Sequence, residues 1–392
     1  MKPLSRKTKI VIGVLTPICA LLLAFLILCV VTMCTYSPTF LGRVLTHFDS
    51  GVTDYKIFPE RIIKKSETPY VYEKDINSAI GEIIVKNKSL NEFVDSTATT
   101  SFIIVKNDKI VYEKYANGYS ENSVNTSFSM SKSIASLLIG EAVEKGFIKS
   151  VNERIENYIE EFKDKQIGKT TIEDLLLMRS DIVYNENKFL WFGDDTLTYW
   201  HSDLRNLALS HTELTDEYNG NFHYNNYHPL LLGIILERST KTSVSEFFGR
   251  EIWQKIGAEH DASWSLDSEK SGFEKMESGI NFRAIDFIKI GSMVLHDGFF
   301  NGTQVINSDW LKRSTLCDIN ADEYKGTFLE GKDAGYKYMW YCTSDKDIVA
   351  WGKSDQILYI SPSTETVILR TGKTDGGVDD WLNVLKDITT KI

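Results

Sequence analysis

Cysteine is scarce in this sequence, and the short motifs that bind nucleotides or metals are missing. Only five cysteines occur among 392 residues, and three of them fall inside one apolar run near the N-terminus. The other two, Cys317 and Cys342, are free to pair in an oxidising compartment, but their spacing does not decide whether they do. Glycine-rich phosphate loops, Gly-x-Ser-x-Gly and metal-ligand spacings are absent. The sequence therefore predicts a protein that needs no cofactor and no metal ion.

Positive charge is also in short supply. Beyond residue 34 the chain carries 40 Lys and Arg against 54 Asp and Glu. A surface this acidic repels a phosphate backbone, so we expect no nucleic-acid partner, and it disfavours anionic lipid as well. The length suits one large domain, or two domains in close contact, with a substantial core.

Long apolar runs are absent apart from one. Residues 10–34 include no charged residue, and about 20 apolar residues are enough to span a bilayer. The preceding segment, 1–9, holds four basic residues and no acidic one, so the positive-inside rule places it in the cytoplasm and the rest on the exoplasmic side. A cleaved signal peptide is the alternative, but the run exceeds a usual signal core and no Ala-x-Ala-like site follows it. We therefore expect a single-pass membrane anchor.

The apolar pattern predicts strands at both ends of the chain and helices between them. Residues 35–97 have mixed polarity and are interpreted as a connecting arm. Two β-rich runs, 101–105 and 109–113, flank a polar turn and predict a hairpin. Helical patterns dominate from about 150 to 311, and strands return at 347–351, 356–360 and 365–370 before an amphipathic helix from 379. Residues 98–392 are thus expected to form an α/β (α+β) domain whose antiparallel sheet, built from both chain ends, is interrupted by a mostly helical insertion.

The string Ser129-Met130-Ser131-Lys132 is the most informative feature. Residues three apart on a helix share a face, so the hydroxyl of Ser129 and the amine of Lys132 lie one turn apart. This pair suits a nucleophile and its proton acceptor, provided that the amine is at least transiently neutral. Four-residue Ser-x-x-Lys strings are common, and an N-cap serine at an exposed helix start is the alternative.

Further strings in the same order carry a family resemblance. They are Ser127 to Ser133, Leu175-Leu176-Leu177-Met178-Arg179-Ser180, Tyr224-Asn225-Asn226 and Leu231-Leu232-Gly233. Together they closely resemble the serine β-lactamase and penicillin-binding protein superfamily, in its class C and esterase branch. Phe58-Pro59-Glu60-Arg61 and the run from 356 to 362 are most similar to the 6-aminohexanoate-dimer hydrolase group. The resemblance covers about residues 40 to 390 and implies a cleft between the sheet and the helical insertion.

The resemblance also implies roles for individual residues. Ser129 attacks a carbonyl carbon and becomes an acyl-enzyme, and Lys132 accepts or relays its proton. Tyr224 is a second candidate base, although its local sequence equally suits a packed aromatic side chain. Asn226 corresponds to the residue that hydrogen-bonds the lysine or the substrate amide, with a helix cap as the alternative.

The third motif departs from the family pattern. Where the superfamily has Lys-Thr-Gly or His-x-Gly on the strand lining the cleft, we match Lys353-Ser354-Asp355, followed by Gln356. Lys353, Ser354 and Gln356 are thus expected to bind or support substrate. Asp355 then stands in place of the glycine that the resemblance puts beside the oxyanion hole. Its side chain would add bulk and negative charge next to the developing oxyanion, which would oppose catalysis. Ser180-Asp181 stands where Ser-Gly is usual, and the following loop, with Tyr184, is expected to wall the cleft.

These features predict a membrane-anchored serine hydrolase that cleaves an amide or ester outside the cytoplasm. The expected partner is a small-molecule amide, ester or peptide substrate. Linear amides and carboxylic esters rank above β-lactams, and a D-amino-acid peptidase comes third. A non-catalytic binding homologue, with an oxyanion hole disabled by Asp355, is the competing class.

Overall fold

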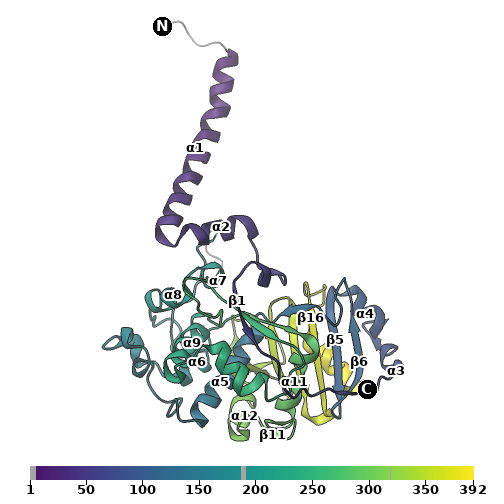
Figure 1. Ribbon diagram of the computed structural model, residues 1–392. Helices are drawn as coiled ribbons and strands as arrows, with labels where there is room; N and C mark the ends of the chain where they lie inside the picture. Colours follow the sequence, from purple (N-terminus) through teal and green to yellow (C-terminus); the bar gives the residue numbers. More distant parts are fainter. Residues whose placement is uncertain (1–5, 187–190, 318) are drawn as a thin grey trace.

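Two segments far apart in the sequence build the central sheet. The computed structural model describes residues 6–186, 191–317 and 319–392. In this part of the chain the larger sheet has eight strands, in the spatial order β12 (Gly335–Lys337), β13 (Trp340–Cys342), β14 (Ile348–Gly352), β15 (Gln356–Ser361), β16 (Thr366–Gly372), β5 (Thr99–Lys106), β6 (Lys109–Tyr115) and β2 (Glu73–Lys74). Neighbouring strands are antiparallel except for β2 and β6. Strands β5 and β16, from opposite chain ends, lie side by side (Figure 1). The expected sheet is confirmed.

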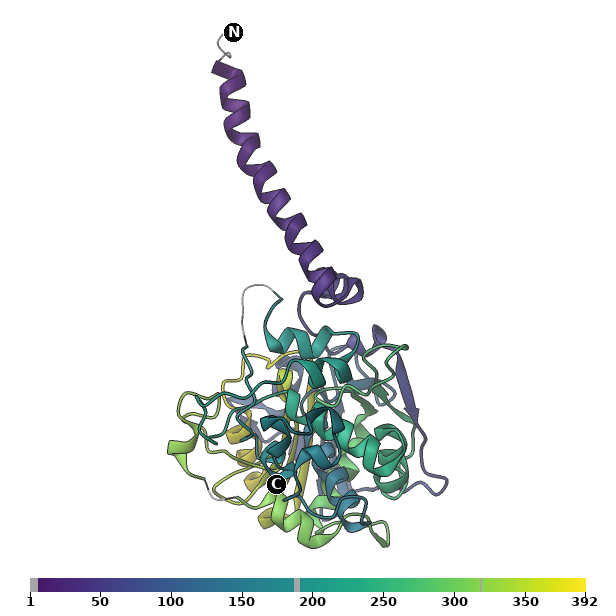
Figure 2. The same ribbon diagram turned by 90° about the vertical axis from the view of Figure 1, so that its left-hand side faces the viewer.

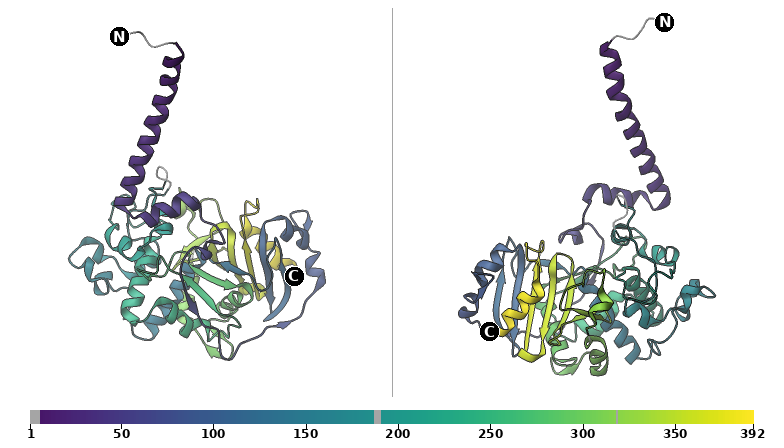
Figure 3. Two further views of the ribbon diagram at one scale, coloured as in Figure 1. Left: turned by 45° about the horizontal axis from the view of Figure 1, so that its top comes forward. Right: turned by 180° about the vertical axis from the view of Figure 1, so that it is seen from behind.

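Helices cover both faces of this sheet. Helix α11 (Ala284–Leu295) packs on β16, β15 and β5. Its Gly291 allows close approach, because a Cβ there would lie 2.4 Å from Val367 Cγ1. On the other face, α4 (Leu90–Ser96) and α13 (Trp381–Lys391) are joined by an edge-to-face contact of Phe93 and Trp381. The right-hand view of Figure 3 shows α13, in yellow, lying across the sheet. Since helices cover both faces, nearly every residue of β5 and β16 is buried, the polar ones included.

The intervening residues form a mainly helical region beside the sheet, as expected. Its helices are α5 (Met130–Glu144), α6 (Ile172–Leu176), α7 (Asp194–Trp200), α8 (Leu204–Ser210), α9 (Tyr227–Thr240), α10 (Val244–Phe248) and α12 (Ser308–Thr315). The same region contributes to a second sheet that the sequence pattern did not indicate, ordered β1 (Glu60–Ile63), β8 (Ala262–Ser265), β9 (Ile280–Arg283) and β7 (Val124–Thr126). These strands have only three or four residues, too few for a periodicity to stand out.

Segment 35–97, interpreted above as an arm, is more than a connector. It supplies β1 and β2, the short helix α3 (Ser78–Gly81), helix α4 and the small hairpin of β3 (Ile84–Val85) and β4 (Lys88–Ser89). A second small hairpin, β10 (Phe299–Phe300) with β11 (Thr303–Gln304), follows α11. Residues 35–97 therefore contribute one strand to the eight-stranded sheet and one to the four-stranded sheet.

Helix α1 (Arg6–Thr35) projects away from the rest of the protein (Figures 1 and 2). Its residues Ile12–Thr35 have a mean hydropathy of 3.0. This stretch is long and apolar enough to span a membrane, and it is also compatible with a signal sequence. Helix α2 (Pro38–His47) lies across the foot of α1 in both views. Pro38 occupies its first turn and the Ser37 hydroxyl accepts a hydrogen bond from Phe40 N, so these residues start a new helix close to the end of α1.

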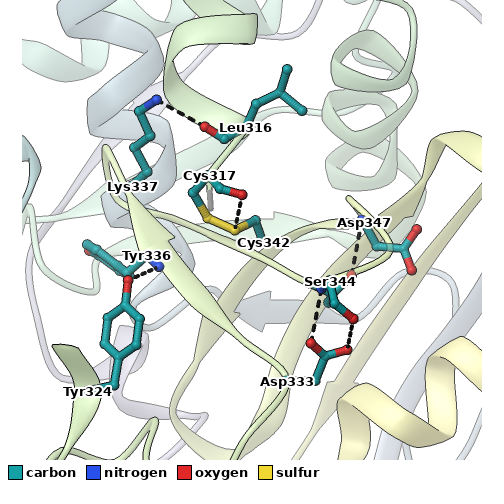
Figure 4. Close-up of a disulfide and its surroundings, with 10 residues drawn as sticks. Leu316, Cys317, Tyr324, Asp333, Tyr336, Lys337, Cys342, Ser344 and Asp347 are labelled. Atoms are coloured by element: carbon teal, nitrogen blue, oxygen red, sulfur yellow. Dashed lines mark hydrogen bonds between the residues drawn. A yellow bond between two sulfur atoms is a disulfide. The ribbon is translucent and has the colours of Figure 1, made fainter. Parts of the chain in front are cut away.

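Cys317 and Cys342 form a disulfide (Figure 4). Cys342 ends β13, and Cys317 follows α12, with the two Cα atoms 6.2 Å apart. Nearby, Lys337 Nζ donates a hydrogen bond to Leu316 O, 3.0 Å away. The sequence left this pairing open. The disulfide links the segment after α12 to β13, the second strand of the large sheet.

Candidate active site

Ser129 stands at the N-terminus of α5, where its hydroxyl oxygen accepts a hydrogen bond from Lys132. Although Ser129 occupies the N-cap position, its side chain makes no capping hydrogen bond. Instead Lys132 Nζ lies 2.9 Å from Ser129 Oγ and 3.1 Å from Glu277 O. Lys132 is 2% exposed. Phe128, the residue before Ser129, has a φ of 44°. A non-glycine residue in this left-handed region marks a constrained backbone, of the kind found next to reactive groups. The helix-cap alternative for Ser129 does not describe this geometry.

Tyr224 lies beside the same pair. Lys132 Nζ is 4.8 Å from the centroid of the Tyr224 ring. The ring packs edge-to-face against Phe328 and Tyr336, with centroid distances of 5.4 and 6.2 Å. A cavity of about 370 Å³ is lined by Ser129 and Tyr224 together. The structure thus brings together the three side chains to which the sequence assigned the chemistry.

Asn226 and Tyr184 form a hydrogen-bonded pair next to Ser129. Asn226 precedes α9 but, like Ser129, makes no capping bond. Its Nδ2 donates to Tyr184 Oη at 2.7 Å and to Thr198 Oγ1 at 3.1 Å. Tyr184 is only 3% exposed, and this burial raises the pKa of its phenol well above the usual value. Tyr184 therefore does not wall the cleft as expected; it orients Asn226, which lines a cavity beside Ser129.

Gly352, the last residue of β14, lies directly against the backbone of Ser129. A Cβ at this position would be 2.5 Å from Ser127 O and 2.9 Å from Ser129 N. The backbone here is extended, with a φ of −131° that any residue adopts, so the need for glycine comes from this contact. The match of Asp355 to the family glycine is therefore wrong by three residues. That match aligned Lys353 and Ser354 with the first two residues of the family motif, which put Asp355 at the glycine. The residue that approaches Ser129 is Gly352, which precedes Lys353.

Asp355 belongs to the turn that follows. Ser354 and Asp355 both have positive φ, 60° and 53°. The Asp355 carboxylate accepts a hydrogen bond of 2.7 Å from Trp351 Nε1, and burial raises its pKa. Arg370 donates to the backbone oxygens of Ser354 and Asp355. Ser354 and Asp355 thus shape the link between β14 and β15 and border the cavity with Tyr224.

Gln356 ties the backbone of this turn to β16 through hydrogen bonds. It is 1% exposed, and its Nε2 donates to Gly372 O at 2.7 Å while its Oε1 accepts from Gly372 N at 3.1 Å. It also donates to Lys353 O at 3.2 Å. Among the two roles that the sequence left open for Gln356, this geometry fits support rather than contact with substrate.

Lys353 connects the end of β14 to the segment that follows α2. Its Nζ donates to Asp49 Oδ1 at 2.6 Å and to Ser50 Oγ at 2.7 Å. Phe48, Asp49, Ser50 and Lys353 all line a cavity of about 300 Å³ that also includes Ser129. The N-terminal segment is therefore part of the site, which sequence reasoning missed because no motif marks it.

Carboxylates line the same cavity. Glu186, Asp195 and Glu277 contribute to its wall. Burial, and secondarily the nearby Asp195, raise the pKa of Glu186. Glu277 is 2% exposed; its Oε1 lies 2.9 Å from Lys275 Nζ, and its Oε2 has no hydrogen-bond partner among the residues that the structure describes. Asp195 and Glu277 belong to no motif, so the sequence offered no signal for them.

Comparison with known proteins assigns the family. A family model described as Beta-lactamase matches residues 88–354, more than half of the chain. The chain belongs to the beta-lactamase family. This family match and the relatives below support a serine hydrolase that acts on amides or esters.

Relatives of this beta-lactamase-family protein agree in fold. The 6-aminohexanoate-dimer hydrolase of Paenarthrobacter ureafaciens is 24% identical over 298 residues, covering 72% of this chain and 74% of that protein. A solved structure of a candidate 6-aminohexanoate-dimer hydrolase from Bacillus anthracis has a TM-score of 0.77 and 22% identity, covering 87% of this chain and 92% of that one. A penicillin-binding protein from Bacillus halodurans gives a TM-score of 0.58 and 14% identity, covering 77% and 100%. The resemblance inferred from the motifs is confirmed.

Proposed function

We propose that this beta-lactamase-family hydrolase is anchored by α1 and cleaves a linear amide or ester through an acyl-Ser129 intermediate. The observation that carries the proposal is the geometry around Ser129. Its hydroxyl is 2.9 Å from a buried lysine amine, and its backbone N–H lies against a glycine. A hydroxyl aimed at a base and a sterically open backbone amide are what nucleophilic attack on a carbonyl requires.

The reaction proceeds in two half-reactions. Lys132 accepts the proton as Ser129 Oγ bonds to the carbonyl carbon, and Tyr224, over whose ring the amine lies, assists as a second base. The negative oxygen is bound by the N–H of Ser129 and by that of Lys353, the residue after Gly352. The C–N or C–O bond then breaks, and the proton passes to the leaving amine or alcohol. Water next attacks the acyl-enzyme and releases the acid.

The acidic wall supports the choice of substrate class. A penicillin carries a carboxylate, and so does the C-terminus of a peptide. Glu277 is paired with Lys275, and Lys353 in the same cavity is paired with Asp49. Glu186 and Asp195 therefore remain as the carboxylates that repel such groups, because like charges at close range disfavour each other. Neutral or cationic linear amides and esters avoid this cost. The same geometry argues against a disabled oxyanion hole, since the Asp355 carboxylate is held by Trp351.

Two observations support an uncleaved, exoplasmic arrangement. Thr32 of α1 is fully buried, and its Oγ1 accepts a hydrogen bond of 3.0 Å from Trp191 Nε1, so the end of the apolar helix packs into the domain. The disulfide of Cys317 and Cys342 suits an oxidising compartment. Removal of α1 by signal cleavage would expose the Trp191 ring.

The proposal is tested by intact-mass spectrometry on the full chain in detergent, wild type beside Ser129→Ala, after exposure to a fluorophosphonate, esters, linear amides and a penicillin. We expect an adduct on wild type alone, with faster acylation by esters and amides than by the penicillin. Folded wild type that forms no adduct with any compound would refute the hydrolase mechanism. Alkaline extraction and protease protection of membranes test the anchor and its side.

A further inference from the structure

Both rims of the Ser129 cavity are attached to the apolar helix. On one side, Phe48, Asp49 and Ser50 follow α2, the helix lying at the foot of α1 (Figure 2). On the other side, Glu186 and Asp195 line the cavity. A site meant for substrates dissolved in water needs no such link to a membrane helix.

Trp191 makes the second attachment. It lies in sequence between the two carboxylates and is 5% exposed. Besides its hydrogen bond to Thr32, its ring meets Phe25 of α1 edge-to-face, with the centroids 6.4 Å apart. Trp191, which lies between the two carboxylates in the sequence, is thus held against α1.

Phe48 is the most exposed aromatic side chain of the first rim. It is 78% exposed, and its φ of 52° places it in the left-handed region, which a bulky residue rarely adopts. Lys353 holds the next two residues through hydrogen bonds of 2.6 and 2.7 Å. Leu45, on α2, is 49% exposed. A strained, fastened backbone that presents an apolar ring at the cavity mouth indicates a ligand-binding role.

The position of these side chains decides what they contact. Helix α2 begins three residues after α1 ends, so it lies at the level of the bilayer–water interface once α1 spans the membrane. Phe40, Leu41 and Val44 on α2 are buried against the domain, which leaves Leu45 and Phe48 as the apolar residues available outside. Leu45 and Phe48 follow the end of α1 by 10 and 13 residues, so lipid chains are the apolar phase within reach once α1 spans the membrane.

We propose that the Ser129 cavity takes its substrate from the membrane surface, and that this substrate is an amphiphile with an amide or ester group. Its apolar chain lies along Leu45 and Phe48, and its carbonyl reaches Ser129. The end beyond the carbonyl is neutral or cationic, to suit the carboxylates of the cavity. This inference rests on the proposed function, in which Ser129 is the nucleophile and α1 is the anchor.

The test uses the full chain in phosphatidylcholine nanodiscs and a series of p-nitrophenyl esters from acetate to laurate. In each turnover Ser129 Oγ bonds to the acyl carbon as p-nitrophenolate leaves, and water then releases the fatty acid. We expect kcat/KM to rise with chain length. Phe48→Ala and Leu45→Asp lower the laurate-to-acetate ratio about tenfold, because contact with about two methylenes is lost. The control is Phe299→Ala on β10, a 51% exposed phenylalanine remote from the cavity, which keeps the wild-type ratio.

The outcomes separate the two proposals. If wild type acylates at Ser129 but the ratio does not rise with chain length, or if Phe48→Ala and Leu45→Asp behave like Phe299→Ala, the membrane-surface inference is overturned and the hydrolase stands. If no ester acylates Ser129 in folded protein, the proposed function fails and the inference falls with it.

Discussion

Replacing Gly352 by alanine tests the oxyanion site most directly. The added Cβ would lie 2.5 Å from Ser127 O and 2.9 Å from Ser129 N, distances that real Cβ atoms essentially never show. Because Ser127 O and Ser129 N are both backbone atoms, the start of α5 or the end of β14 has to move. The φ of −131° suits alanine, so the substitution adds no backbone strain of its own. The perturbation therefore falls on the position of the Ser129 amide.

Loss of one oxyanion donor lowers kcat by about 100- to 1000-fold, and we expect Gly352→Ala to fall in this range. Crowding also costs about 1–3 kcal/mol of stability. The control is Gly291→Ala, whose Cβ would lie 2.4 Å from Val367 Cγ1 in the core. This variant should melt at a lower temperature but retain kcat.

The assay is ester hydrolysis under saturating substrate, with thermal melting to verify folding. Gly352→Ala with a kcat within about threefold of wild type would refute the role assigned to this contact. Asp355→Gly discriminates between the two matches of the third motif. If Asp355 occupied the glycine position, its replacement would raise kcat, whereas the structure predicts no gain because the carboxylate is bound to Trp351.

Three further predictions follow from other parts of the structure. Lys132→Met keeps the buried volume but removes the base, so kcat for ester hydrolysis should fall about a thousandfold in folded protein; a kcat near wild type would refute the assignment. Serine at both Cys317 and Cys342, which are 25 residues apart, should lower the free energy of unfolding by about 3 kcal/mol in denaturant titrations, and an unchanged midpoint would contradict this. Burial raises the pKa of Glu141 to about 7, so the folded state holds a proton that the unfolded state has lost, and stability falls as pH rises from about 4.5 through 7. Glu141→Gln should therefore raise the melting temperature at about pH 8 but hardly at about pH 5, and equal gains at both would refute the shift.

The features that the sequence predicted best are local ones. Helix geometry alone places a serine and a lysine three residues apart on one face, and the 2.9 Å contact of Ser129 and Lys132 follows from it. The β-branched runs at both ends similarly predicted the central sheet, because each run is long enough to show its pattern.

Contacts between distant segments could not be predicted in the same way. Gly352 meets Ser129 through the docking of a strand on a helix start, and a string match placed the motif three residues too late. The hydrogen bond between Lys353 and Asp49 joins residues that are 304 positions apart, and no sequence motif links the two. The position of Tyr184 in its loop suggested a residue of the cleft wall. In the folded protein its side chain is buried, and its hydroxyl accepts a hydrogen bond from Asn226.

The pairing of β5 with β16 also sets when this protein becomes able to react. Residue 106 pairs with residue 366, so the central sheet closes only after nearly the whole chain has been made. Non-local pairing of this kind is slow, since a long loop must close before any contact is gained. Ser129 and Lys132 come early, but the strand that brings Gly352 to them comes late. Under the proposed mechanism, a nascent or truncated chain therefore lacks an assembled site around Ser129, and hydrolysis starts only once synthesis and folding are complete.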